Sequence, residues 1–416
     1  GCYVQTGLTN VEKDVHVDLA VGNNHKKDIA EILERYLEER RKADGQRAHL
    51  TKTLNGTTVM DMSRSCEYEE MQLRQTAEHT RAYIKIQDGC NQFCSYCVIP
   101  YARGRVRSRR AEDILQEVRG LAEAGYREVV LTGIHISSYG IDLQEAVRDR
   151  GNGSENDGGR QSGELCMEDV EAALLPKDSS AKWEGCGTSR GDIGLMGLVE
   201  QIHEIPGIDR IRLGSLEPRI INEESAGRLA ALPKFCPHFH LSLQSGCDTT
   251  LKRMNRHYTT GEYYTCVQIL RRFFDAPAIT TDVIVGFPGE TEAEFALTKA
   301  FLQKVGFYEM HVFKYSRREG TRAAAMPDQV PEPVKTQRSG ELLELKRIQS
   351  RAFRERYIGR EAEVLLEERR EIEGRVLLTG HTKDYVKIAV DAEVGYRENT
   401  IVTVPVKEFL TDEIMI

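Results

Sequence analysis

Three cysteines close together in the chain are the residues whose type and spacing point most directly to chemistry. Cys90, Cys94 and Cys97 lie in GCNQFCSYC, with three and then two residues between them. A loop this short can direct three thiolates at one iron–sulfur cluster, and no fourth cysteine follows nearby, unlike in ferredoxin-type loops. We therefore expect a 4Fe–4S cluster in which one iron stays open to another ligand.

A zinc site is the alternative for cysteines this close together. Structural zinc sites take four ligands and commonly use two separate C-x2-C pairs. No second pair follows here, and His135 and His238 stand alone in the sequence, as satisfied core histidines do. The spacing therefore favours the cluster over zinc.

An open iron of this kind suggests a reaction. It can chelate the amino and carboxylate groups of S-adenosylmethionine (SAM), and one electron from the cluster then breaks the sulfonium bond and releases a 5′-deoxyadenosyl radical. We expect the electron to come from a partner such as flavodoxin or ferredoxin. The rings of Phe93 and Tyr96, inside the loop, suit packing over the cluster and the adenine.

Strand ends supply candidates for the rest of the cofactor site. The segments LTGIHISSYG (131–140) and DVIVGFPGET (282–291) each bring a glycine to the end of a predicted strand, and SLEPR places a carboxylate at another strand end. Taken singly, each glycine segment also fits a simple turn, and the carboxylate fits an ordinary surface acid. The candidate cofactor-binding residues are Phe93, Tyr96, Thr132, Gly133, Glu217, Gln244, Asp282 and Gly286.

The elements that must position these residues alternate between strands and helices. Short apolar runs predict strands at 128–133, 211–215, 240–246, 281–287 and 311–316, with apolar residues at helical spacing between them. This alternation predicts an α/β fold with parallel strands, which we interpret as a partial (β/α) barrel. Functional residues then gather at the carboxyl ends of the strands.

Two polar segments interrupt this pattern. Residues 40–75 are polar and aperiodic, which indicates a linker. Residues of about 143–191 are rich in glycine and acidic side chains, so they cannot bury enough apolar surface to order themselves. We expect a mostly flexible insertion there, with a short helix at 165–175.

The end of the chain has a different character. A proline-rich segment at 326–333 precedes a charged helix around 335–357. The short apolar runs beyond it predict a small closed β-barrel with strands at 364–366, 376–378, 385–390 and 401–406.

Length and composition set the class of protein. With 416 residues, 40% hydrophobic and 29% charged, the chain predicts two or three soluble domains. No signal peptide or long apolar run is present, and ten scattered cysteines do not form a secreted disulfide framework, so we expect a reducing cytoplasm and no membrane. The net charge of −8 disfavours nucleic acid only weakly, because arginines gather at 101–110.

Taken together, these motifs resemble the radical SAM methylthiotransferases. The resemblance runs from Thr80 to about Arg322 and rests on the triad, LTGIHISSYG, SLEPR, HLSLQSGCDTTLKRMNR, TDVIVGFPGET and FKYSRREGTRAA. The end of the chain looks like the family's TRAM domain, a small RNA-binding barrel. The resemblance implies that the cysteine triad, as catalytic and metal-binding residues, holds the cluster that cleaves SAM.

This resemblance divides the chain into five parts. We expect the remnant of a truncated amino-terminal α/β auxiliary-cluster domain at 1–40, a linker at 41–75, a radical SAM core at 76–325 that contains the insertion, a linker helix at 326–352 and the TRAM domain at 353–416.

A second, auxiliary 4Fe–4S cluster is implied by the same resemblance. The family binds it with three amino-terminal cysteines, of which Cys2 matches the last, and the other two would precede Gly1. We therefore expect the amino-terminal part of the family pattern to be missing, with one cluster here and no completed methylthio transfer. The cysteines expected to be ordinary thiols are Cys66, Cys166, Cys186, Cys236, Cys247 and Cys266.

The residues of one motif indicate the substrate. LTGIHISSYG resembles the branch of the family that converts N6-threonylcarbamoyladenosine in tRNA to its 2-methylthio derivative, whereas the isopentenyladenosine branch has Gln-Asn where Ile134 and His135 stand. We therefore expect the threonylcarbamoyladenosine beside the anticodon as substrate. The alternatives are isopentenyladenosine in tRNA and an aspartate of a ribosomal protein.

Basic residues are the candidates for contacts with the tRNA anticodon loop. They are Arg103, Arg105, Arg107, Lys383 and Lys387. The arginines could instead pair with acidic residues of the next helix, and the lysines could form a solvated face. Two other classes also remain open: a non-catalytic RNA-binding iron–sulfur protein, and a radical SAM methylase or lyase without sulfur insertion.

Overall fold

The computed structural model describes the chain except for residues 43–51, 55–56, 63–67, 70–79 and 145–193. Nearly all of the predicted insertion, its short helix at 165–175 and most of the predicted linker at 41–75 lie outside the described residues. Within the part of the chain that is described, no helix has the length and apolar character needed to cross a membrane.

Seven strands build the predicted partial barrel. They are β1 (Arg81–Asp88), β2 (Arg107–Ser108), β3 (Glu128–Gly133), β4 (Arg210–Leu213), β5 (His238–His240), β6 (Ala278–Val285) and β7 (Glu309–Lys314). One sheet has the order β2-β1-β3-β4 and the other β5-β6-β7, with all strands parallel except β2. Isolated bridges from Ile211 to Phe235 and from Leu216 to Leu241 join the two sheets, so the strands form one continuous arc.

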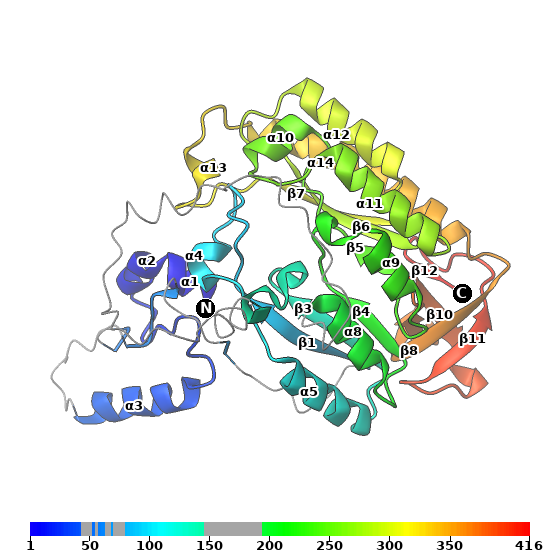
Figure 1. Ribbon diagram of the computed structural model, residues 1–416, viewed down its shortest axis with the longest axis horizontal. Coiled ribbons are helices and arrows are strands. Elements are labelled where there is room, and N and C mark those ends of the chain that lie inside the picture. Colours follow the sequence, from blue (N-terminus) through cyan, green and yellow to red (C-terminus); the bar gives the residue numbers. More distant parts are fainter. Residues whose placement is uncertain (43–51, 55–56, 63–67, 70–79, 145–193) are drawn as a thin grey trace, which may run out of the picture.

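Helices cover the outer side of this arc (Figure 1). The longer ones are α5 (Ala111–Glu123), α8 (Leu195–His203), α9 (Glu223–Ala230), α11 (Thr260–Phe273) and α12 (Glu292–Val305). Ile114 and Val118 of α5 are fully buried in one large core with Ile84 of β1 and Leu131 of β3. Short helices occupy the loops: α4 (Ile99–Arg103), α10 (Asp248–Arg253), α13 (Arg322–Ala325), and the 3-10 turns η2 (Ile136–Ser138) and η3 (Pro218–Ile220).

One predicted strand is shorter than expected. The apolar run at 240–246 predicts a continuous strand, but β5 ends at His240. Gln244 has a positive φ of 69°, and it meets β6 only through an isolated bridge to Val283. A left-handed residue interrupts the regular ladder, so apolar content alone overestimates the strand.

A long helix, α14 (Glu332–Glu355), leads to the carboxy-terminal sheet. The sheet has the order β11-β8-β9-β10-β12, with β8 (Glu361–Ile372), β9 (Arg375–His381), β10 (Lys387–Asp391), β11 (Ile401–Pro405) and β12 (Ile414–Met415), and a 3-10 turn η4 (Ala392–Val394) follows β10. Backbone hydrogen bonds from Lys407 and Glu408 to Ile416 join the residues after β11 to the end of β12. These bonds bring the two edges together, as a small barrel requires.

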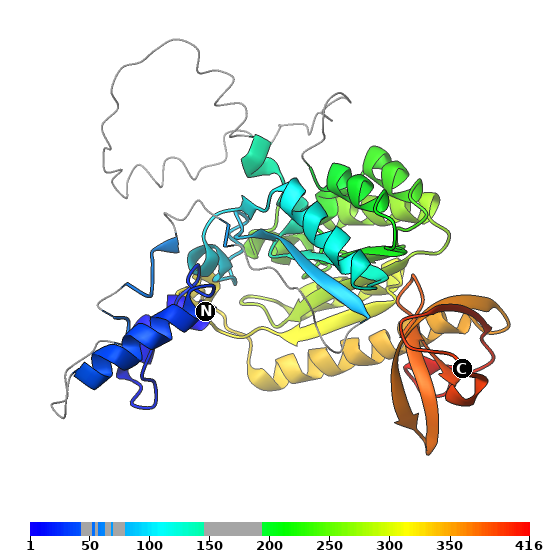
Figure 2. The ribbon, with the colours of Figure 1, turned by 90° about the horizontal axis from the view of Figure 1, so that it is seen from below.

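The amino-terminal part is helical. It comprises α1 (Cys2–Thr6), α2 (Leu8–Lys13) and α3 (Ile29–Lys42). Among the described residues before β1 there is no strand, so the regular elements of residues 1–40 are helices alone. Figure 2 shows this part and the carboxy-terminal sheet at opposite ends of the molecule.

Candidate metal centre and cofactor site

The three cysteines lie in the loop between β1 and α4, and neighbouring elements fix this loop through its backbone. Ser95 donates its N–H to the carbonyl of Met254 (3.0 Å), and Ala323 donates to the carbonyl of Ser95 (2.8 Å). The Asn255 side-chain amide donates to the carbonyl of Phe93 (3.0 Å). Segments far apart in the sequence therefore hold the cysteines in place.

A glycine before the first cysteine makes the return of the loop possible. Gly89 has a φ of +71°, and a Cβ added there would lie 1.7 Å from the carbonyl oxygen of Arg105. Cys90 donates its N–H to the carbonyl of Gly104 at 3.1 Å, which closes the loop onto the end of α4. Only glycine fits this close approach.

The thiols fit an iron–sulfur cluster. Burial raises the pKa of the Cys90 thiol to about 12, and the nearby Cys94 and Cys97 add to this rise. A coordinated metal ion reverses this effect, because a ligating thiol loses its proton. All three cysteines are free and half-buried in one short loop, so the residues present suit a cluster held by three thiolates.

Sequence reasoning did not identify a half-buried arginine, Arg256, beside the cluster loop. Arg256 donates from Nη1 to the Sγ of Cys94 at 3.3 Å and stacks over the ring of Tyr258. It follows α10 in a polar segment, so its place could be found only through the fold. A cation here stabilises the negative charge of the Cys94 thiolate.

The carboxyl ends of β1 and β3 meet beside the cluster loop. Gln87 accepts the N–H of His135 (2.8 Å) and donates to the carbonyl of Gly89 (2.8 Å), which links the end of β3 to the cluster loop. Thr132 donates its hydroxyl to the carbonyl of Ile84, and a Cβ at Gly133 would lie 2.8 Å from Ile136. The close packing at Gly133 explains the glycine in this motif.

Glu217 is buried rather than an ordinary surface acid. Its carboxylate accepts from the Nε of Arg219 at 2.7 Å, and its backbone N–H donates to the hydroxyl of Ser137 (2.9 Å). The acid in SLEPR therefore packs directly against the loop that follows β3.

Two further candidates, Gln244 and Asp282, meet at β6 in the second sheet. Gln244 donates its N–H to the carbonyl of Asp282 (2.9 Å), and the Asp282 carboxylate lies 3.3 Å from the Nε2 of His240. With His311 of β7, these two side chains offer donor atoms within 4.8 Å of one another, which could hold a metal ion. Sequence reasoning missed His240 and His311, because the register that aligns them is a tertiary feature.

The GFPGE turn after β6 is held by α14. Gly286 has a φ of +70° and donates its N–H to the Glu290 carboxylate (2.7 Å). Arg338 pairs with that carboxylate at 2.7 Å, and both side chains are almost fully buried. The linker helix thus fixes one of the predicted cofactor loops.

The chain is similar in sequence to known radical SAM proteins. The Radical SAM superfamily model matches residues 84–302. A threonylcarbamoyladenosine tRNA methylthiotransferase, MtaB of Bacillus subtilis (strain 168), is 34% identical over 93% of this chain and 73% of its own length. A tRNA-2-methylthio-N(6)-dimethylallyladenosine synthase of Acetivibrio thermocellus is 32% identical over 97% of this chain and 73% of its own length.

The chain belongs to the radical SAM methylthiotransferase family. The family implies a 4Fe–4S cluster and SAM as cofactors. Among solved structures, the radical SAM enzyme HemN of Escherichia coli aligns with 66% of this chain and 54% of that chain, at a TM-score of 0.39 and 15% identity, which is too distant to add to the assignment.

In this methylthiotransferase, the amino-terminal helices bring Cys2 close to the end of the cluster loop. Its Sγ accepts a hydrogen bond from the Nε of Arg103 at 3.2 Å, and Asn23 donates to the carbonyl of Ala102 (2.6 Å). Arg103 also pairs with Asp88 at 3.2 Å. The structure therefore places Cys2 beside the residues that follow the cluster cysteines.

The five predicted RNA-binding residues differ in accessibility. Arg107 is 2% exposed and lies beside Asp88, whereas Arg105 is exposed and stacks on Phe93 at 4.9 Å. At the other end of the methylthiotransferase, Lys383 donates to the carbonyl of Pro233 and Lys387 pairs with Glu368 at 3.4 Å. Arg105 is therefore the most accessible arginine of the three.

The predicted thiols of the core are structural. Cys236, Cys247 and Cys266 are buried, as expected for ordinary thiols. The other three cysteines with the same prediction, Cys66, Cys166 and Cys186, lie outside the described residues.

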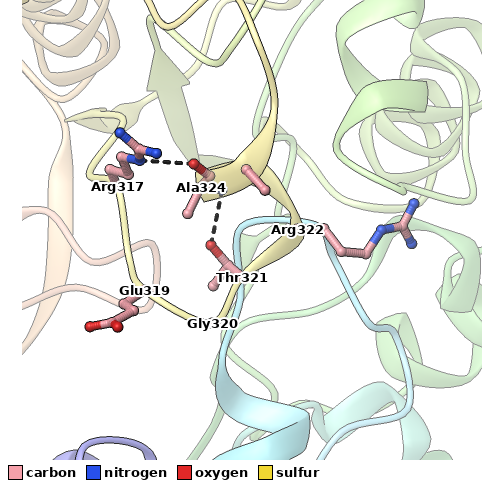
Figure 3. A pocket seen from close by; sticks show the side chains of 7 residues that line it. Arg317, Glu319, Gly320, Thr321, Arg322 and Ala324 are labelled. Carbon is pink, nitrogen blue, oxygen red and sulfur yellow. Dashed lines mark hydrogen bonds between the residues drawn. The ribbon is translucent and has the colours of Figure 1, made fainter.

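A basic pocket adjoins the cluster loop (Figure 3). It lies in the REGTRAA segment after β7, between Arg317 and Ala325. Arg317 donates from Nε to the carbonyl of Ala324 (2.8 Å), and the side chain of Arg322 points away from this turn. Ala323, on the same segment, bonds Ser95 of the loop, so this motif supports the cluster from outside.

Proposed function

We propose that this methylthiotransferase converts N6-threonylcarbamoyladenosine in tRNA, beside the anticodon, to its 2-methylthio derivative. The observation that carries this choice is the polarity of the inner strand faces. Since Ile84 and Ile86 pack outward against helices, Lys85 points to the inner side of β1, and His240, Asp282 and His311 gather on the inner side of β5, β6 and β7. A threonylcarbamoyl group offers a carboxylate, a hydroxyl and ureido groups to such residues.

An isopentenyl group offers only apolar contacts, so it would give these polar side chains no hydrogen-bond partner. This is the physical reason for preferring the threonylcarbamoyl substrate. One reported relative is named for that substrate and the other for dimethylallyladenosine, which makes dimethylallyl-type tRNA the second candidate.

Each part of the site has a proposed role. Cys90, Cys94 and Cys97 hold the cluster, which when loaded with SAM supplies a 5′-deoxyadenosyl radical. Glu217, Gln244, Asp282 and the backbone at Gly133 and Gly286 orient the cofactor, with Phe93, Tyr96 and Thr132 lining it. Cys2 is the proposed ligand of an auxiliary cluster, next to Arg103.

Contacts with the tRNA follow from the accessible basic residues. The anticodon loop presents splayed bases, so the target adenosine can reach the site without opening a duplex. The proposed phosphate contacts are Arg105, near the cluster loop, and Lys383 and Lys387, at the carboxy-terminal sheet. Arg103 and Arg107 support the segment that carries Arg105. A flavodoxin or ferredoxin is the proposed electron donor.

The test is anaerobic reconstitution with iron and sulfide, followed by incubation with SAM, dithionite and tRNA. In protein that holds both clusters, mass analysis of the nucleosides should show 2-methylthio-N6-threonylcarbamoyladenosine from tRNA that carries threonylcarbamoyladenosine, and none from tRNA that carries isopentenyladenosine. The reverse pattern would select the second candidate. Formation of 5′-deoxyadenosine without any methylthio product from either tRNA is expected of protein that holds only the SAM-cleaving cluster; the same result with both clusters present would indicate a radical SAM enzyme that inserts no sulfur.

A further inference from the structure

His135 is held rigidly but leaves one ring nitrogen unused. Its Nδ1 lies 2.7 Å from the hydroxyl of Ser138, and its backbone N–H donates to Gln87 at 2.8 Å. The Nε2 atom is buried and has no hydrogen-bond partner among the described residues. Buried polar atoms are almost always paired, so an unpaired one at a strand end points to a ligand.

The surroundings of this nitrogen are positively charged. Burial, together with the nearby Arg256 and Arg219, lowers the pKa of the His135 imidazole to about 4. His135 is therefore neutral, so only one of its two ring nitrogens carries a hydrogen. When Nδ1 accepts from Ser138, Nε2 carries the hydrogen and becomes a donor.

Arg219 lies on the same side with donors to spare. Its Nε donates to Glu217 at 2.7 Å, while its Nη1 and Nη2 atoms have no recorded partner within the described part of the chain. Glu217 in turn bonds Ser137, so Arg219 and His135 are tied to one loop. A guanidinium with both terminal nitrogens open is suited to two-point binding of a carboxylate.

We propose that the Nε2 of His135 and the terminal nitrogens of Arg219 bind a carboxylate, that of the threonyl group on the substrate adenosine. Arg256 is occupied by the Cys94 sulfur and lies nearer the cluster, which leaves Arg219 for a carboxylate farther out. The assignment of this carboxylate rests on the proposed function. A second source has the same chemistry, because the methionyl end of SAM also carries a carboxylate.

The experiment compares two anticodon stem-loops that differ in this group alone. One carries threonylcarbamoyladenosine and the other carries the same nucleoside with the carboxylate converted to its methyl amide. We expect the reconstituted wild-type protein to prefer the carboxylate by about tenfold or more in Kd, since hydrogen bonds to charged groups contribute at this level. His135→Phe and Arg219→Gln should abolish the preference.

Two controls separate this effect from misfolding. His135→Gln keeps a donor near the Nε2 position and should restore part of the preference. Arg272→Gln removes an exposed arginine that also pairs with a glutamate, Glu223, on the helix side, and it should keep the full preference. Iron content of each reconstituted variant shows whether the cluster loop has folded.

The outcomes distinguish the two sources. If His135→Phe and Arg219→Gln keep the RNA preference but raise the half-saturating SAM concentration for 5′-deoxyadenosine formation about tenfold, the carboxylate is that of SAM and the substrate assignment is wrong. If neither quantity changes, the carboxylate site itself is wrong. If the wild-type protein shows no preference and makes no 2-methylthio-N6-threonylcarbamoyladenosine, the proposed function fails first.

Discussion

At the amino ends of the barrel strands, Arg210 and Arg212 are buried and donate to carbonyls of the carboxy-terminal sheet. At the carboxyl ends, Arg256 lies beside the cluster loop, and Arg219 is tied through Glu217 to the loop that follows β3. Arg210 bonds the carbonyl of His381 (2.8 Å), and Arg212 bonds that of Lys383 (2.9 Å) as well as the Glu128 carboxylate (3.0 Å). At one end, arginines connect the barrel to the carboxy-terminal sheet, a contact that we call the joint. At the other end, arginines lie at the proposed ligand site.

The two ends differ in where the arginines find their interaction partners. At the joint, the ring of Tyr385 stacks between His238 and His381 and lies under Arg81 and Arg212. The protein itself supplies these partners, so the sheet docks in one fixed position. At the cluster end, Arg219 and His135 keep donors for a molecule that is not part of the chain. A buried charge is tolerable only when such partners arrive.

The largest effect is expected at the cluster end. Replacing Cys94 with alanine removes one of three ligands, so iron content and 5′-deoxyadenosine formation should fall by more than about 100-fold, since even changes outside the ligand set cost about 10- to 100-fold. Iron analysis and chromatography of the nucleosides check this. Cys266→Ala, at a buried thiol of α11, is the control and should keep its iron; full iron in Cys94→Ala would remove the triad from the site.

The joint is tested by Arg212→Met. This change leaves the fully buried Glu128 without its 3.0 Å partner, and removing one member of a buried pair costs about 3–5 kcal/mol. We expect a lower midpoint of chemical unfolding and faster proteolysis before the carboxy-terminal sheet.

The adjacent Arg127→Gln is the matched control for this joint. Arg127 pairs with Asp209 at 2.8 Å, but both side chains are more than a third exposed, so the loss should not exceed about 1 kcal/mol. Adding Glu128→Gln to Arg212→Met should recover part of the stability. Equal losses for Arg127→Gln and Arg212→Met would contradict the distinction between the joint and an ordinary surface pair.

Lower pH should weaken the cluster end through His135. Its pKa is about 4 in the folded chain, against about 6.5 in an unfolded one, so the unfolded state binds more protons between these values. Stability from this group is therefore complete above about pH 6.5 and is lost as the pH falls to about 4, a change of about 3 kcal/mol. Unfolding free energies from pH 7 to 4 should show a shallower loss for His135→Gln, with His16→Asn as the control for removing an exposed imidazole.

The smallest expected effect is a difference in tRNA binding between variants of two arginines in the 101–110 segment. Arg105→Gln should weaken tRNA binding slightly. It should also make the negative slope of log K against log salt shallower by about one, because one phosphate contact is lost. Arg107→Gln should leave the slope unchanged, since Arg107 is buried beside Asp88. Binding measured over a range of salt concentrations tests both, and equal slopes for the two variants would contradict the assignment.

Much of the fold could be read from the chain because its signals are local. The apolar run at 128–133 coincides with β3, and the run at 401–406 coincides with β11 to within one residue. The run at 364–366 predicts only part of β8, which continues to Ile372. The second half of β8 is held by backbone pairing with β9 while its side chains are largely exposed, so apolar content cannot reveal it.

By itself, the sequence determined the cysteine triad, the order of strands and helices, and the family. These features depend on neighbours in the chain, because three ligands in one loop and a repeating apolar period need no distant partner. Tertiary structure alone decided that Arg256 meets Cys94, that Arg107 is buried while Arg105 is exposed, and that the Nε2 of His135 is left unpaired near Arg219. A charged side chain looks the same in a sequence whether it faces water, a domain joint or a ligand, since only the fold sets the partners and the water around it.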